Sequence, residues 1–113
     1  MDCLFCKIID KSILANIIYE NDNIIAFDDI NPKSPVHVLI IPKIHIPTLN
    51  DLNEEHKNLM GELVFTAKLL AEDLGIDEAG YRLNFNCNQA GGQTVYHIHL
   101  HLMGGREFGW PPG

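Results

Sequence analysis

The chain has 113 residues, which is the usual size of one domain and is enough to bury a core without disulfides or other cross-links. Hydrophobic residues make up 46% of it and charged residues 20%, which excludes an intrinsically disordered chain. The formal net charge of −7 argues against a duplex nucleic acid partner, although a single phosphate can still be held by backbone amides. We therefore expect one domain over residues 1–113.

The apolar runs, such as residues 38–41, are far shorter than the roughly 20 residues needed to cross a bilayer. Residues 1–7 have neither the basic leader nor the apolar stretch of a signal peptide. We therefore expect a protein of the cytosol or nucleus, without a membrane partner. In such a reducing compartment, the pair Cys3-x-x-Cys6 is better interpreted as a metal or redox candidate than as a disulfide.

The first half of the chain predicts a short helix and three strands. A short helix or turn opens the chain at residues 3–9, followed by apolar runs at 17–19 and 24–27. The Asn-Asp-Asn tripeptide between these runs predicts a hairpin turn. After a loop with two prolines, residues 36–41 form the most strand-like segment.

The second half predicts one long helix and two further strands. Apolar residues recur at helical spacing over residues 53–74, namely Leu59, Leu63, Ala67, Leu70 and Leu74. Asn53 is a suitable N-cap and Gly75 a suitable end. Strands are expected at residues 81–86 and 95–102, with a polar glycine loop at residues 88–93 between them. These elements predict an α+β fold with a five-stranded, mainly antiparallel sheet.

The chemistry is concentrated in residues 97–102, where histidine and aliphatic residues alternate. In a strand, this alternation places His97, His99 and His101 on one face and the aliphatic side chains on the other. Three histidines could hold a catalytic zinc, or one could act as a nucleophile with a neighbour as its acid–base or electrostatic partner. The preceding Gly91, Gly92 and Thr94 suit a phosphate, which favours phosphoryl or nucleotidyl transfer.

The motif His97-x-His99-x-His101 resembles the one that names the histidine triad superfamily. Residues 91–96 and the ending at residues 104–113 resemble the Hint branch, the histidine triad nucleotide-binding proteins. Residues 27–32 and 37–43 are similar to signatures in the first half of that family. The resemblance covers nearly the whole chain and implies the histidine triad fold and a homodimer.

The resemblance also implies a mechanism. His99 would attack the α-phosphorus of a purine nucleoside 5′-phosphoramidate, forming a covalent nucleotidyl-histidine that water hydrolyses. His101 would stabilise charge on a phosphoryl oxygen, Thr94 would lie near the leaving group, and His37 would extend the polar relay. This mechanism needs no metal or other cofactor.

The nucleotide would be held along its length. Asp29 would bind the ribose hydroxyls. The phosphate would be bound by Asn86, Gly92, Gln93, Thr94, His99 and His101, and the base would lie in a slot of Phe5, Ile8, Phe27 and Ile30.

The chain departs from the branch at two positions. Thr94 stands where the branch commonly has serine, and Gly109 stands where a bulkier residue is expected. Both departures bear on which amine the substrate carries. A dinucleoside polyphosphate hydrolase, or a nucleotide-binding interaction protein with incidental hydrolysis, are the alternatives. The Trp-Pro-Pro-Gly ending favours the Hint interpretation over the first of these.

Many family members carry the same cysteine pair. The resemblance implies a structural zinc held by Cys3, Cys6, His45 and His97.

Overall fold

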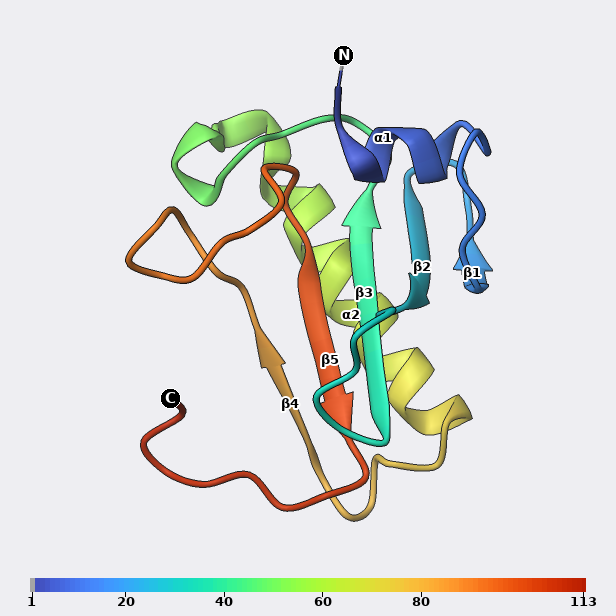
Figure 1. Cartoon of the computed structure of the whole chain (residues 1–113), viewed down its shortest axis with the longest axis vertical. Helices are drawn as coiled ribbons and strands as arrows, with labels where there is room; N and C mark the ends of the chain where they lie inside the picture. The colour runs from blue at the N-terminus through green and yellow to red at the C-terminus, as the bar shows by residue number, and fades with distance from the viewer. Residues whose placement is uncertain (1) are drawn as a thin grey trace.

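The computed structural model describes residues 2–113 and contains one five-stranded sheet (Figure 1). Its helices and strands are α1 (Leu4–Ile9), β1 (Ile17–Glu20), β2 (Ile24–Asp28), β3 (Val36–Pro42), α2 (Lys57–Asp73), β4 (Tyr81–Asn84) and β5 (Leu100–Gly104). The strand order is β1-β2-β3-β5-β4, and every neighbouring pair is antiparallel. The predicted α+β fold is therefore confirmed.

The two faces of the sheet are covered differently. The long helix α2 packs across one face, where Leu63, Ala67 and Leu70 join aliphatic side chains of β2, β3 and β5. On the other face, α1 lies over one end of β2 and β3, and Phe5 and Ile8 form a smaller cluster with residues of those strands. The central strands β2 and β3 are consequently buried on both faces.

The last strand begins later than the sequence predicts. Pairing between β3 and β5 ends at Ile40 and Leu100, so His97 and His99 precede the ladder. Beyond that point the Ile98 N–H donates to the carbonyl of Ile46, and the Pro42 carbonyl accepts from the His97 side chain instead. Alternation nevertheless persists, because Ile98, Leu100 and Leu102 all enter the core beneath α2.

Two other predicted boundaries shift. The strand expected at residues 81–86 ends at Asn84. The long helix begins at Lys57, because residues 54–56 form a 3-10 turn that Asn53 caps by accepting from the Glu55 N–H. Leu74 is the C-cap residue and is exposed, so the apolar stripe does not extend to it.

Within residues 2–113, no helix is both long and apolar enough to span a bilayer.

Candidate active site

A cavity of about 780 Å³ lies on the face of the sheet that carries α1. Its floor includes His101, Leu39 and Phe27, which the strand register places side by side on β5, β3 and β2. The cavity brings together most of the residues predicted for a nucleotide: Phe5, Ile8, Phe27, Asp29, Ile30, Thr94, His99 and His101. One end is therefore rich in imidazole, and the rest of the floor is apolar.

Several lining residues were not predicted from the sequence. Leu39 lies between His101 and Phe27, Leu14 forms an exposed part of the wall, and Asn16 donates a hydrogen bond to Asp28 there. The sequence partly identifies Leu39, because this residue lies in the strand predicted at residues 36–41. Its neighbours in the sheet depend on the strand order, which local sequence patterns do not reveal.

His99 is held in one tautomer by the backbone. Its Nδ1 lies 2.8 Å from the carbonyl oxygen of His97. A carbonyl oxygen only accepts, so Nδ1 carries the proton and Nε2 keeps its lone pair. Burial lowers the pKa of His99, and the ring is only 6% exposed. Near neutral pH, His99 therefore has an unprotonated Nε2 suited to nucleophilic attack.

A relay of hydrogen bonds orients His101. The backbone N–H of Lys33 donates to Nδ1 of His37 at 3.0 Å, so a neutral His37 carries its proton on Nε2. That nitrogen lies 2.9 Å from Nδ1 of His101, which therefore accepts and leaves the Nε2–H of His101 as a donor. Burial, followed by the neighbouring His99 and His37, lowers the pKa of His101 to about 4. His37 does not line the cavity but fixes the ring that does.

Asp29 stands beside this relay. Its Oδ2 is 3.4 Å from Nε2 of His37, and its Oδ1 accepts from the backbone N–H of Asn31. Asp29, His37 and His101 present ligand atoms within 4.8 Å of one another. A metal on His37 Nε2 would require a proton on Nδ1, which already accepts from Lys33. The donor set therefore does not fit a metal.

The glycine loop is ordered by its own side chains. Gln93 is buried, accepts from the Asn88 N–H, and donates to the carbonyls of Pro47 and Val95. Asn86 donates to the Gly91 carbonyl at 2.7 Å. Of the residues predicted for the phosphate, Asn86, Gly92 and Gln93 do not line the cavity, whereas Thr94 does. In this arrangement Asn86 and Gln93 hold the loop that positions Thr94.

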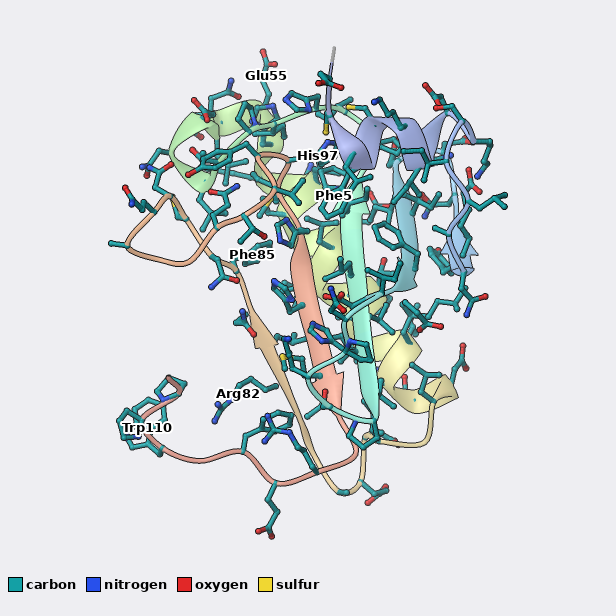
Figure 2. The ribbon with its side chains drawn as sticks, in the orientation of Figure 1. Phe5, Glu55, Arg82, Phe85, His97 and Trp110 are labelled. Atoms are coloured by element: carbon teal, nitrogen blue, oxygen red, sulfur yellow. The ribbon has the colours of Figure 1, made fainter. Side chains whose placement is uncertain are left out.

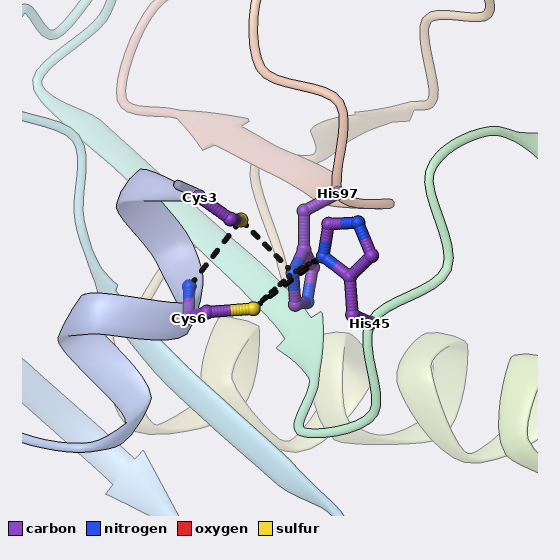
Figure 3. Close-up of side chains that lie close together, drawn as sticks. All are labelled: Cys3, Cys6, His45 and His97. Carbon is purple, nitrogen blue, oxygen red and sulfur yellow. Dashed lines mark hydrogen bonds between the residues drawn. The ribbon is translucent and has the colours of Figure 1, made fainter. Parts of the chain in front are cut away.

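The four residues predicted for zinc form a compact cluster at the start of α1 (Figure 3). The Cys3 sulfur lies 3.5 Å from Nδ1 of His97. The Cys6 sulfur lies 3.4 Å from Nδ1 of His45 and 3.7 Å from that of His97, and the two histidine nitrogens are 3.2 Å apart.

These distances fit a tetrahedral zinc ion. With Zn–S near 2.3 Å and Zn–N near 2.0 Å, a tetrahedron separates sulfur from nitrogen by about 3.5 Å and two nitrogens by about 3.3 Å. Nε2 of His97 donates to the Pro42 carbonyl at 2.8 Å, which leaves Nδ1 unprotonated toward the cluster. Burial and the adjacent Cys3 raise the pKa of Cys6, so paired thiolates there require a compensating cation.

The C-terminal segment runs past β4 and ends on the surface (Figure 2). Arg82 donates to the Gly109 carbonyl at 2.7 Å, and the Phe108 ring lies against the guanidinium groups of Arg82 and Arg106. Trp110 is 87% exposed and lies outside any helix.

The chain is similar to known proteins over nearly its whole length. Residues 2–108 match the family model described as "Scavenger mRNA decapping enzyme C-term binding". The chain is 50% identical over 108 residues to the purine nucleoside phosphoramidase of Escherichia coli K12, covering 96% of this chain and 91% of that protein. It is also 47% identical to a 14 kDa zinc-binding protein of Brassica juncea, covering 99% of this chain and all of the relative.

A solved structure, the HIT family hydrolase from Legionella pneumophila Philadelphia 1, superimposes with a TM-score of 0.97 at 54% sequence identity. The match covers 99% of this chain and 100% of that one.

Proposed function

This chain belongs to the histidine triad family and is a hydrolase, and from that premise we propose that it cleaves the P–N bond of purine nucleoside 5′-phosphoramidates. The observation that carries the proposal is the pair of tautomers at the end of the cavity: a lone pair on Nε2 of His99 beside an N–H donor on Nε2 of His101. The 50% identity to a purine nucleoside phosphoramidase supports the substrate class and the Hint branch.

In the first step, Nε2 of His99 attacks the α-phosphorus and forms an N–P bond as the Pα–N bond to the amine breaks. The amine leaves with a proton passed through the hydroxyl of Thr94, which water replenishes. The Nε2–H of His101 donates to a nonbridging phosphoryl oxygen, whose charge grows in the transition state.

In the second step, water attacks the same phosphorus, the N–P bond to His99 breaks, and the proton released by this water neutralises the hydroxide that formed when water re-protonated Thr94. The nucleoside monophosphate leaves, and His99 returns to its neutral form with Nδ1–H still on the His97 carbonyl. Dividing one difficult displacement into two easier ones accounts for the use of a nucleophile.

Binding places the rest of the nucleotide along the cavity floor. The base packs on Phe5, Ile8, Phe27 and Ile30, and the Asp29 carboxylate accepts hydrogen bonds from the ribose hydroxyls. Neighbouring strands are about 4.8 Å apart. A base above Phe27 therefore lies about 10 Å from His101, two strands away, which suits the length of a nucleoside monophosphate.

The test is AMP release from adenosine 5′-phosphoramidate by the unmodified protein and by His99→Ala, with AMP binding measured for both. We expect release only from the unmodified protein and AMP binding by both. Equal release would exclude His99 as the nucleophile. If neither protein released AMP although both bound it, a dinucleoside polyphosphate hydrolase or a nucleotide-binding role would be favoured.

We also propose that Cys3, Cys6, His45 and His97 hold a structural zinc ion, which would tie α1 to the segment before β5. Its support is the tetrahedral spacing of the four donor atoms and the zinc-binding relative. Metal analysis should find one zinc per chain in the unmodified protein and in Cys87→Ser, and far less in Cys6→Ser. A Cys6→Ser protein with a full equivalent of zinc would contradict this ligand set.

We further propose that the protein is a cytoplasmic homodimer. Among residues 2–113, the edge strand β4 pairs on one side only, and Val64 and Phe65 on α2 are exposed, as is Trp110. A symmetric pairing would continue the sheet from one protomer to its partner. Light scattering at micromolar concentration should give about twice the 12.7 kDa of one chain, and a mass near that of a single chain would contradict the dimer.

A further inference from the structure

We propose that a metal ion in the Cys3, Cys6, His45 and His97 cluster and a nucleoside monophosphate in the cavity strengthen each other's binding, with Phe5 and His97 as the positioning residues that join the two sites. This inference rests on the proposed function, because it requires the cavity to hold a nucleotide. It goes beyond a zinc site that only stabilises the fold.

The first connection is the short helix α1. Cys3 and Cys6 face the cluster, while Phe5 and Ile8, one turn of the same helix, line the cavity. A helix of only six residues is marginal on its own, so its position depends on what its side chains contact. Within the described residues, the contacts of α1 include both the metal donors and the apolar floor.

The second connection is the Phe5 ring, which is 4% exposed. It makes edge-to-face contacts with His97 at 5.9 Å and with His99 at 5.1 Å between ring centroids. A third contact, at 5.5 Å, joins it to Phe27 on the cavity floor. One ring therefore touches a metal donor, the proposed nucleophile and the proposed base slot. Figure 2 shows Phe5 and His97 close together beneath α1.

The third connection is His97 itself, whose side chain and backbone carbonyl take part in different sites. Its Nδ1 belongs to the cluster, and its backbone carbonyl accepts from Nδ1 of His99 at 2.8 Å. The ring is completely buried and anchored at Nε2 by the Pro42 carbonyl. A metal that holds the ring of His97 therefore also holds the carbonyl that orients His99.

Ordering these shared groups costs conformational entropy only once. Whichever ligand binds first restrains α1 and residue 97, so the second binds a site that is already ordered. Linkage requires the effect to be reciprocal, and coupling between sites is typically 5- to 150-fold in affinity. We expect AMP to raise the zinc affinity at least about fivefold, and zinc to raise the AMP affinity by the same factor.

The experiment measures zinc transfer from the zinc-loaded full-length protein to a chromophoric chelator, with and without saturating AMP. It compares the unmodified protein with Phe5→Leu, which keeps an apolar side chain but removes the ring contacts. Phe85→Leu is the matched control, because Phe85 packs in the core cluster on the opposite face of the sheet. Circular dichroism follows the fold, and AMP binding is measured for each protein with and without zinc.

The expected result is a coupling factor of at least about fivefold in the unmodified protein and in Phe85→Leu, and a clearly smaller factor in Phe5→Leu, which keeps only the connections through α1 and His97. Zinc should bind to all three proteins, and AMP should bind more weakly to Phe5→Leu, because this variant has lost a ring of the base slot. A factor of one in the unmodified protein, with both ligands bound, would overturn the linkage and leave the proposed function intact. An unchanged factor in Phe5→Leu would also overturn the proposal, since the Phe5 ring would then not join the two sites. If AMP bound to none of the three proteins, the proposed function and the linkage would be overturned together.

Discussion

Nε2 of His37 lies 2.9 Å from Nδ1 of His101, although the two residues are 64 positions apart in the chain. They meet because β3 pairs with β5, and because the turn before β3 directs the Lys33 N–H onto the other nitrogen of His37. The hydrogen bonds therefore run in one direction, from the Lys33 N–H through His37 to His101. This order leaves the Nε2–H of His101 as the donor available to a ligand.

Replacing His37 with alanine should lower kcat/KM for adenosine 5′-phosphoramidate by about tenfold, which corresponds to about 1.4 kcal/mol, the range of one oriented hydrogen bond. The loss arises because His101 can then adopt the other tautomer, and because the Lys33 N–H loses its acceptor. Steady-state kinetics with His37→Ala measure the effect.

His37→Gln is the matched control, since its carboxamide offers one acceptor for Lys33 and one donor for His101. We expect it to recover much of the activity that alanine loses. If both variants kept full activity, the relay would have no part in orienting His101.

Part of this site could be predicted from the sequence. Alternation in residues 97–102 separates histidines from core side chains, and that separation survives although His97 and His99 lie before the strand. The helical stripe likewise identifies Leu63, Ala67 and Leu70 as core. These patterns are local, and periodicity is sufficient to detect them.

Other features depend on tertiary pairing and escape local patterns. β5 begins where its pairing with β3 ends, at Ile40 and Leu100, because the Pro42 carbonyl farther along β3 is occupied by the His97 side chain. The lining residues Asn16 and Asp28 come together in the cavity wall only when the segment that leads into β1 lies beside β2. The roles assigned to single residues came from the family resemblance.

Buried core side chains should dominate stability. Leu63 on α2 is completely buried, so Leu63→Ala should lower the free energy of unfolding by about 2–5 kcal/mol. Leu14 is 98% exposed, and the same substitution there should change it by less than about 0.5 kcal/mol. Urea denaturation monitored by circular dichroism tests both, and comparable losses in the two variants would contradict the core described here.

Acid should destabilise the protein through His101. The folded state holds its pKa at about 4, below the value of about 6.5 expected for an unfolded chain, so the unfolded state binds more protons between these values. The stability gained by keeping this ring neutral is therefore fully present above about pH 6.5 and is lost as the pH falls toward 4.

The measurement is the free energy of unfolding in urea at pH 7.5, 6.5 and 5.5 for the unmodified protein and for His101→Gln. The unmodified protein should lose stability faster on acidification, by at most about 1.4 kcal/mol per pH unit from this group. Loss of zinc on acidification affects both proteins alike, so the difference isolates His101. Parallel profiles would show that His101 does not titrate differently in the two states.

The glycine loop beside the site should not tolerate a side chain at position 91. A Cβ on Gly91 would lie 2.5 Å from the carbonyl oxygen and 2.9 Å from the nitrogen of Cys87, and backbone atoms cannot rotate away. Gly91→Ala must therefore displace the loop that carries Thr94, and we expect kcat/KM to fall by about 10- to 100-fold, because a shift of about 1 Å at a reacting centre costs that much. Gly61→Ala on α2 is the control, since nothing lies within 4 Å of its added Cβ. Activity of Gly91→Ala equal to that of Gly61→Ala would mean that the position of this loop does not limit the reaction.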